Sequence, residues 1–468
     1  MTNRRRAASF SRTLLATAMG ACLTAGCGVI PGGSGGSGDT LTVMTFAPID
    51  TKATNMPGMP GMAKAYERWV NANGGIKGHK LRVLTCNEKN TPAGAGECAR
   101  QAVSEKAIAV VGSYSQHGRS FMAPLEAAGI PFVGGYGVSS EEFQSTLSYP
   151  INGGQPALLA GAGHQLGKAC SEVSLVRPDT LAGDSMPVLL NAGLKVNKMA
   201  DAHDIRAAED ATDFTQQARD ALTGTAATGS AATGSGSGSG SGSTASPSPS
   251  PSSSSSSSST PSPSAGGSTK EAAKDGAKSC VTAVLGERTE TFFDAFRRVN
   301  SQAPQISSVL GSVSQALVDR TGGKESPFEG ALLTSWYPVS TDPLWAPMRK
   351  VISEQAFGDD SVDPDDSGAQ TTWIAYTVLS EILKGMDDGD VTGRKVARAL
   401  GQSSGVKTGG LTPDLSWRYQ DMRAISGFPR LVNGRVSFQV VQAGRLVTQP
   451  GEAPQDMTSV LEQAPRSA

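Results

Sequence analysis

The chain has 468 residues, with 41 Lys and Arg against 42 Asp and Glu, and only 5% of its residues are aromatic. A balanced chain with no basic block is unlike a nucleic-acid-binding protein, which needs clustered positive charge. Beyond the N-terminal segment, no apolar run reaches the roughly 18 residues that span a bilayer, which excludes a polytopic membrane protein. Ser, Gly, Thr, Pro and Ala make up nearly all of the tract at 223–269. The rest of the chain is long enough for two lobes of ordinary domain size.

The N-terminus has the layout of a bacterial signal peptide. Four arginines precede a short apolar stretch at 13–23, and small residues then lead to Cys27. This order resembles a lipobox, in which the Cys is acylated and becomes the new N-terminus; the alternative is an ordinary signal peptide with an unmodified Cys. Two acyl chains on one Cys give stable anchoring. We expect a signal peptide at 1–26, a lipid on Cys27 and a flexible tether at 27–38, on the outer face of the bacterial cell membrane.

Cysteine usage fits that location. Once the signal peptide is removed and Cys27 carries lipid, the cysteines that remain are Cys86, Cys98, Cys170 and Cys280. An even number in an oxidising compartment predicts two disulfides, with three possible pairings. No two are spaced as CxxC and the four histidines are scattered, so we expect no metal site and no cofactor.

Strands and helices alternate along the chain. In order, the first half predicts strand 41–46, helix 62–73, strand 80–84, helix 98–104, strand 107–111, a helix that ends at residue 128, strands 130–133 and 173–176, a helix that ends at residue 193, strand 195–199 and helix 213–222. The second half predicts strand 281–285, helix 290–299, strands 306–310 and 331–334, helices 344–357 and 369–385, and an antiparallel pair at 435–441 and 445–447. Apolar strands that alternate with helices predict an α/β fold with parallel sheets covered on both faces.

The residues from 66 to 81 carry a family likeness. They include N-x-x-GGI-x-G-x-K-L, beginning at Asn71, and the segments 110–113, 128–132, 213–214 and 328–331 continue the match. The chain resembles the leucine/isoleucine/valine-binding proteins, which are type I periplasmic binding proteins that feed ABC importers. The resemblance implies two Rossmann-like lobes joined by three crossovers, with the ligand held between them.

The resemblance also implies domain boundaries. Lobe 1 would comprise 39–150 and 310–425, and lobe 2 would comprise 151–309 and 426–450. The tract at 223–269 would be a disordered insert in lobe 2, and 451–468 a flexible tail. The protein would be a monomer, with a small-molecule ligand and an ABC permease as its partners.

Ligands of open α/β sheets bind beyond the carboxyl ends of the strands. The loops after strands 107–111 and 130–133 supply hydroxyls suited to a carboxylate, although serines there could simply cap helices. The resemblance adds an aromatic wall and an acidic partner for an ammonium group, near Glu287 or Glu290. We expect the ligand-binding residues to be Ser113, Tyr114, Ser115, Tyr136, Ser139 and Glu287.

The same lobe assignment indicates which of the three possible cysteine pairings to expect. Cys170 and Cys280 both precede strands of lobe 2, so they should meet at the end of that lobe opposite the ligand. We therefore predict a Cys170–Cys280 disulfide at the base of the insert. The remaining pair, Cys86–Cys98, would join a strand end to the next helix.

The expected function is that of a solute-binding lipoprotein that captures an amino acid, amide or related solute for an ABC importer. The alternatives are a ligand-sensing lipoprotein that signals to a partner receptor and a ligand-free scaffold. We expect no enzyme, because the near-matches at 161–168 and 407–409 lack the companion residues of nucleotide and β-lactamase motifs. Met56, Met59 and Met62 have the spacing of a Cu(I) site, but we prefer to interpret them as a loop before the first helix, with Met62 in the core. The alternative is an adaptable apolar wall beside the ligand.

Overall fold

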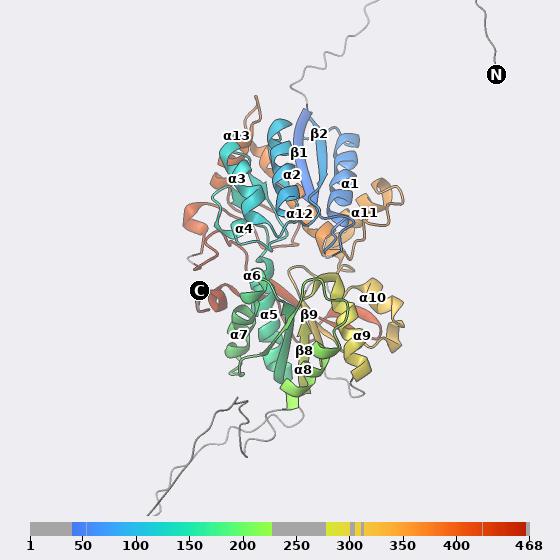
Figure 1. Cartoon of the computed structure of the whole chain (residues 1–468). Helices are drawn as coiled ribbons and strands as arrows, with labels where there is room; N and C mark the ends of the chain where they lie inside the picture. Colours follow the sequence, from blue (N-terminus) through green and yellow to red (C-terminus); the bar gives the residue numbers. More distant parts are fainter. Residues whose placement is uncertain are drawn as a thin grey trace, which may run out of the picture. The chain divides into compact units, whose positions relative to one another are not determined.

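The computed structural model describes residues 40–52, 54–226, 278–299, 305–309, 313–423 and 425–464. The predicted signal peptide, Cys27, the tether and most of the predicted insert lie outside these residues. The described strands form two sheets (Figure 1). Each sheet with the helices packed on it is called a lobe below.

The sheet of the first lobe has five parallel strands in the order β2-β1-β3-β4-β5. They are β1 (Thr40–Ala47), β2 (Lys80–Asn87), β3 (Val110–Val111), β4 (Phe132–Val133) and β5 (Ser148–Tyr149). Along β1, Leu41 and Val43 pack into one core cluster, whereas Met44 and Phe46 pack into another. Successive side chains of a strand point to opposite faces, so both faces of this sheet are covered.

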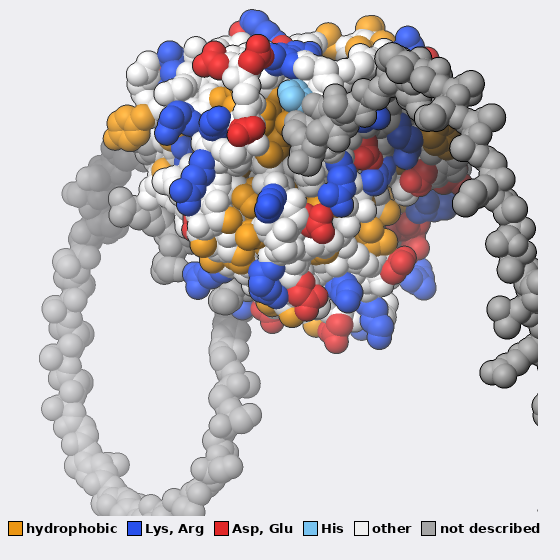
Figure 2. All heavy atoms as spheres, turned by 90° about the horizontal axis from the view of Figure 1, so that it is seen from above, with side chains coloured by type: hydrophobic (Ala, Val, Ile, Leu, Met, Phe, Trp, Pro, Cys, Tyr) orange, Lys and Arg blue, Asp and Glu red, His pale blue; other side chains and the backbone are white. Residues whose placement is uncertain are grey.

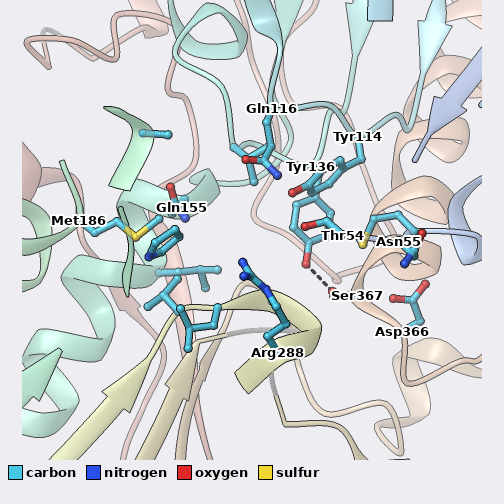
Figure 3. Close-up of a pocket in the computed structure, with 18 of the residues that line it drawn as sticks. Thr54, Asn55, Tyr114, Gln116, Tyr136, Gln155, Met186, Arg288, Asp366 and Ser367 are labelled. Atoms are coloured by element: carbon cyan, nitrogen blue, oxygen red, sulfur yellow. Dashed lines mark hydrogen bonds between the residues drawn. The ribbon is translucent and has the colours of Figure 1, made fainter. Parts of the chain in front are cut away.

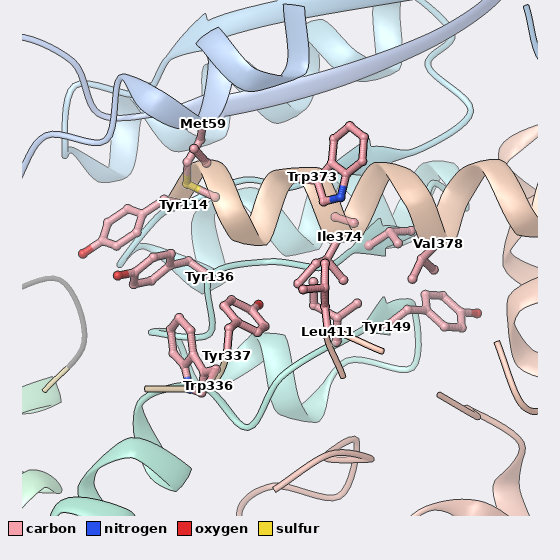
Figure 4. Packing of buried hydrophobic residues seen from close by; sticks show 14 of the residues in the cluster. Met59, Tyr114, Tyr136, Tyr149, Trp336, Tyr337, Trp373, Ile374, Val378 and Leu411 are labelled. Carbon is pink, nitrogen blue, oxygen red and sulfur yellow. The ribbon is translucent and has the colours of Figure 1, made fainter. Parts of the chain in front are cut away.

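Helices cover the two faces of the first sheet. The first face carries α1 (Gly58–Ala72), α11 (Ala346–Gln355) and α12 (Ser367–Gly385), and the second carries α2 (Pro92–Ser104) and α3 (Gly118–Ala128). The lobe is completed by α4 (Glu141–Gln144) and α13 (Gly393–Gln402). α12 is buried on nearly all sides, and Figure 4 shows Trp373, Ile374 and Val378 of this helix among the core side chains.

The sheet of the second lobe runs in the order β12-β11-β10-β9-β8-β6-β7, with β13 paired to β11. Its strands are β6 (Cys170–Pro178), β7 (His203–Ala207), β8 (Lys278–Ala283), β9 (Gln305–Val309), β10 (Leu332–Ser335), β11 (Arg435–Gln442), β12 (Arg445–Thr448) and β13 (Gln455–Asp456). β6 to β10 pair in parallel, and β11 pairs antiparallel with β10, β12 and β13. The antiparallel pair predicted at 435–441 and 445–447 is therefore confirmed.

The second sheet is also covered on both faces. Its helices are α5 (Gly154–Ala169), α6 (Leu181–Asp184), α7 (Met186–Val196), α8 (Thr215–Ala226), α9 (Thr289–Val299), α10 (Gln315–Arg320) and α14 (Thr458–Glu462). α5 and α7 approach closely, because a Cβ on Gly163 would lie 2.0 Å from the carbonyl oxygen of Leu190. The glycine-rich stretch at 161–168 thus lies inside α5 and serves helix packing, not phosphate binding.

The chain passes between the lobes three times, and hydrogen bonds link the crossings. The Asn152 side-chain amide donates to the Tyr337 hydroxyl at 3.0 Å, which joins the first crossing to the second. The Asn433 amide donates to the carbonyl oxygen of Ile151 at 2.9 Å, which joins the third crossing to the first. Two Rossmann-like lobes with three crossings are the predicted fold class, which is confirmed.

Both predicted disulfides are present. Cys86 of β2 is bonded to Cys98 of α2, with a Cα–Cα distance of 5.7 Å. Cys170, where β6 begins, is bonded to Cys280 of β8, with a Cα–Cα distance of 5.9 Å. β8 begins at Lys278, so the second bridge lies where the chain re-enters the second sheet after the predicted insert.

Two predictions for the second lobe are wrong: the start of a lobe-1 segment and the position of a strand. The segment 310–425 was expected in lobe 1, but its strand β10 pairs with β9 and β11 and is therefore an interior strand of the second sheet. The strand expected at 195–199 does not exist, because α7 continues to Val196 and β7 begins only at His203. The apolar residues of α7 at helical spacing extend the helix into the segment interpreted as a strand.

The predicted limits of the insert and the tail also need correction. The insert was expected to begin at residue 223, but α8 continues to Ala226. The tail at 451–468 was expected to be flexible, but β13 pairs with β11 and α14 packs against α5 and α7. Leu461 of α14 is buried in the core, which gives this segment a reason to be ordered.

Charge is mixed on the surface. On the face shown in Figure 2, basic and acidic side chains are interspersed. This face therefore does not have the clustered positive charge that binding to nucleic acid requires.

Candidate ligand-binding site

A pocket of about 350 Å³ is lined by residues of both lobes and of the crossings (Figure 3). From the first lobe, its lining includes Tyr114 in the loop after β3 and Tyr136 in the loop after β4. From the second lobe, it includes Thr180 after β6 and Arg288 after β8. These segments all follow the carboxyl ends of parallel strands, which is where ligands of this fold class bind.

One side of the pocket is a continuous aromatic wall made of Tyr114, Tyr136 and Trp336. The ring centroids of Tyr114 and Tyr136 are 5.2 Å apart, and those of Tyr136 and Trp336 are 5.0 Å apart. The Tyr136 hydroxyl is hydrogen-bonded to the Ser367 hydroxyl at 2.7 Å, and the Trp336 indole N–H donates to the Gly154 carbonyl oxygen at 2.9 Å. Burial raises the pKa of both tyrosines, so their hydroxyls stay protonated and neutral.

The hydroxyl groups of three predicted ligand residues are hydrogen-bonded to other groups of the protein. The Ser113 hydroxyl accepts from the Phe46 backbone N–H at 3.0 Å. The Ser115 hydroxyl donates to the Glu88 carboxylate at 3.0 Å, and the Ser139 hydroxyl donates to the Glu142 carboxylate, also at 3.0 Å. The pocket lining does not include these three serines.

The other three predicted residues have different outcomes. The pocket lining includes Tyr114 and Tyr136. Glu287 lies in the 3-10 turn Gly286–Arg288, labelled η2, which follows β8. Its side chain is outside the described part of the structure, so its role as an ammonium partner stays a prediction.

The Glu142 carboxylate fixes the loop that carries Tyr136. It accepts from the backbone N–H groups of Gly137, Val138 and Ser139 at 2.9, 3.0 and 3.0 Å. Burial raises the pKa of this carboxyl to about 7. Because these bonds replace water around the carboxylate, Glu142 supports the pocket wall without facing the pocket.

The charged residues of the pocket were not predicted from the sequence. Arg288 ends η2, and Asp363, Asp365 and Asp366 lie in the segment before α12. The Asp366 carboxylate accepts from the N–H groups of Gly368 and Ala369, as the N-cap of α12. Burial raises the pKa of Asp365 and of Asp366.

The sequence contained a signal for some of these residues. Asp366 immediately precedes the predicted helix at 369–385, so it could have been recognised as a cap. Arg288 lies three residues after the predicted strand at 281–285. The same rule that selected Glu287, ligand contact beyond the carboxyl end of a strand, applied equally to Arg288.

The three methionines lie in two different environments. Met56 lines the pocket, whereas Met59 and Met62 are buried in the core. Within the described ranges, no three His, Cys, Asp or Glu side chains are placed to hold a metal ion.

Comparisons with known proteins agree with this architecture. Residues 51–241 match the family model described as periplasmic binding protein. A substrate-binding periplasmic protein from Ralstonia solanacearum superimposes with a TM-score of 0.63 at 14% identity, over 87% of this chain and 100% of that chain. The fold is that of the type I periplasmic binding proteins. The family resemblance predicted from the sequence is thereby confirmed.

Two further structural neighbours of the chain are informative. A solute-binding protein of an ABC transporter from Rhodopseudomonas palustris HaA2, in complex with p-hydroxybenzoic acid, has a TM-score of 0.62 and 14% identity over 88% of this chain and 96% of that chain. A leucine binding protein from Thermotoga maritima has a TM-score of 0.59 and 12% identity over 88% of this chain and 98% of that chain. No curated protein sequence is significantly similar to the chain. Among the helices that the structure describes, none has the length and hydropathy of a membrane span.

Proposed function

We propose that the protein is an extracytoplasmic solute-binding lipoprotein that captures a small polar ligand between its lobes and delivers it to an ABC importer. The observation that carries the proposal is the pocket of about 350 Å³ lined by both lobes and the crossings. Its volume lies within the range of small-molecule sites. Two lobes joined by crossings suit a hinge motion, whose closed form a permease can recognise.

The ligands of the structural neighbours suggest where to search. One neighbour is in complex with p-hydroxybenzoic acid and another is described as a leucine binding protein. Both solutes combine a small apolar body with a polar end. The aromatic wall here, together with the side-chain amides of Gln116 and Gln155 that line the pocket, suits solutes of that kind.

The binding proposal is tested by thermal unfolding of the purified protein with amino acids, amides, small peptides, purines and hydroxybenzoates. A ligand of the folded state stabilises by about 2.7 kcal/mol at a hundredfold excess over its Kd, which gives a readable shift. We expect one chemical class to raise the Tm. Gln116→Ala should weaken that effect, and Gln101→Ala, which replaces an exposed Gln of α2, should not. If no solute shifts the Tm and mass spectrometry detects no co-purified ligand, the proposal is wrong.

Lipid anchoring is a separate part of the proposal. It is supported by the arginines, the apolar stretch and the small residues that precede Cys27. Cells grown with an alkyne fatty acid should label the wild-type protein and leave it in the membrane fraction. Cys27→Ala should abolish the label, and a variant that is still labelled would contradict the assignment of Cys27.

A further inference from the structure

Arg288 is the one basic side chain among the described residues that line the pocket. Its Nη1 donates to the carbonyl oxygen of Ala208 at 3.2 Å and to that of Glu209. No ion pair to a described carboxylate is present, and its Nε is buried without a partner. The guanidinium is therefore oriented by two neutral acceptors; the carboxylates of Glu209 and Asp210 act on it electrostatically, but neither forms an ion pair with it in the described part of the chain.

Arg288 is half-buried and forms no ion pair with a described residue, so it can take an anionic ligand. A charge that leaves water is normally balanced by a charged partner, because desolvation of an isolated ion is costly. The guanidinium is planar, always positively charged and shaped to hold a carboxylate through two parallel hydrogen bonds. Figure 3 shows Arg288 reaching from the second lobe into the pocket, toward the side that carries Tyr136.

The first lobe offers no comparable donor from its serines. Ser113, Ser115 and Ser139 are hydrogen-bonded to the Phe46 backbone, Glu88 and Glu142. A ligand carboxylate would have to displace the bond that the Ser113 hydroxyl donates to the Val111 carbonyl oxygen, or those that Ser115 and Ser139 donate to the two carboxylates. Of the described pocket residues, only Arg288 offers a positive charge to an anion.

The acidic residues limit how much negative charge a ligand can carry. Glu209, Asp363, Asp365 and Asp366 also line the pocket, so its described acidic residues outnumber its one basic residue. A second negative group on the ligand would be repelled by these carboxylates. A ligand with one carboxylate at Arg288 and a neutral or cationic remainder avoids that repulsion.

We propose that the ligand is a monocarboxylate with an apolar or aromatic body, and that its carboxylate is bound by Arg288 of the second lobe. The body of the ligand packs on the aromatic wall of Tyr114, Tyr136 and Trp336. This inference rests on the proposed solute-binding function and adds the chemical class and the orientation of the ligand. The carboxylate lies at the second lobe, and not at the serine loops of the first.

The experiment compares each carboxylate with its neutral amide. The probes are benzoate with benzamide, 4-hydroxybenzoate with 4-hydroxybenzamide, and 4-methylpentanoate with 4-methylpentanamide, with phthalate as a dianion. Calorimetry measures their affinity for wild type, Arg288→Gln, Arg288→Lys and Arg219→Gln, the last of which replaces an exposed arginine of α8. Thermal unfolding without ligand shows whether each variant is folded.

We expect at least one carboxylate to bind wild type about 10- to 100-fold more tightly than its amide, the usual range for hydrogen bonds to a charged group. Arg288→Gln should remove that difference and leave the weak binding of the amide, whereas Arg219→Gln should keep it. Arg288→Lys should retain part of the difference, because it keeps the charge and loses the planar geometry. Phthalate should bind more weakly than benzoate.

If a carboxylate binds wild type, two outcomes would overturn the inference and leave the proposed function intact. One is an amide that binds wild type as tightly as its carboxylate. The other is a carboxylate whose affinity is unchanged in Arg288→Gln, or in Arg288→Lys if the Gln variant does not fold. If no carboxylate binds wild type at about 10 mM although another solute raises its Tm, the inference is wrong and the proposed function is retained. If no solute of any class binds, the inference and the proposed function both fail.

Discussion

The two sides of the pocket are attached to the rest of the protein in different ways. The aromatic wall belongs to the main core cluster, and Trp336 and Tyr136 are 3% and 9% exposed. Figure 4 shows both rings among buried side chains of the first lobe and the crossings. On the opposite side, Arg288 is held by the carbonyl oxygens of Ala208 and Glu209 and has no ion pair with a described residue.

Because of this difference, the two sides of the pocket contribute unequally to the stability of the fold and to recognition of the ligand. A side chain that fills a core cannot be removed without leaving a cavity, so the aromatic wall serves the fold as well as the ligand. A side chain held by two hydrogen bonds can be replaced at low cost to the fold. The chemical identity of the solute can therefore change most easily on the Arg288 side.

The largest expected effect is on the aromatic wall. Trp336→Ala should lower the free energy of unfolding by about 3–5 kcal/mol, because it removes a buried indole and leaves a cavity. The Gly154 carbonyl oxygen also loses its bond from the indole N–H. Urea denaturation of wild type and variant measures the difference.

Arg288→Gln is the matched comparison for this change. Its unfolding free energy should stay within about 1 kcal/mol of wild type, since only hydrogen bonds to two carbonyl oxygens are altered. The proposed contrast between the two sides would be refuted by an Arg288→Gln variant destabilised as strongly as Trp336→Ala.

A smaller effect is expected from the titration of Glu142, which holds the Tyr136 loop. This titration should change the free energy of unfolding by about 3 kcal/mol at most. Its pKa is raised from 4.5 to about 7 in the folded protein. Between these values the folded carboxyl keeps its proton while the unfolded one loses it, so stability falls as the pH rises from 4.5 to 7. Glu142→Gln removes this titration and should flatten that part of the pH profile.

The neighbouring residue provides the control for Glu142. Glu141 lies beside it in α4 and pairs with the exposed Arg119 at 3.2 Å. Glu141→Gln should leave the decline between pH 4.5 and 7 in place. A Glu142→Gln variant whose unfolding free energy declines as steeply as wild type would show that this carboxyl does not titrate in that range.

Much of the fold was predictable from the sequence because its signals are local. The apolar strand 41–46 and the GGI turn after Asn73 identify the first βαβ unit. The two disulfides were predicted by combining the positions of the cysteines relative to strands with the lobe assignment that the resemblance implies. The lobe assignment of β10 was missed because strand pairing joins distant segments. β10 is hydrogen-bonded to β11, about a hundred residues later, and no local pattern encodes that partner.

The candidate site was predicted less well, for a physical reason. The loops after β3 and β4 both contribute to the pocket lining, as expected for loops that follow the strands of a parallel sheet. Within a loop, however, the sequence does not show which hydroxyl faces the pocket and which one bonds internally. Ser115 and Ser139 are engaged by Glu88 and Glu142, two carboxylates buried by tertiary packing, whereas Tyr114 and Tyr136 in the same loops face the pocket.

The smallest expected effect distinguishes the ring of Tyr136 from its hydroxyl. Tyr136→Phe removes the hydrogen bond to Ser367 and should cost about 1 kcal/mol of unfolding free energy. Tyr149→Phe is the matched control outside the pocket lining, because its hydroxyl donates to the Ala397 carbonyl oxygen at 2.8 Å. If the wall contributes its ring and not its hydroxyl, both variants should keep ligand affinity within about threefold of wild type. A larger loss of affinity in Tyr136→Phe alone would place the hydroxyl in contact with the ligand and make the aromatic wall a second polar anchor opposite Arg288.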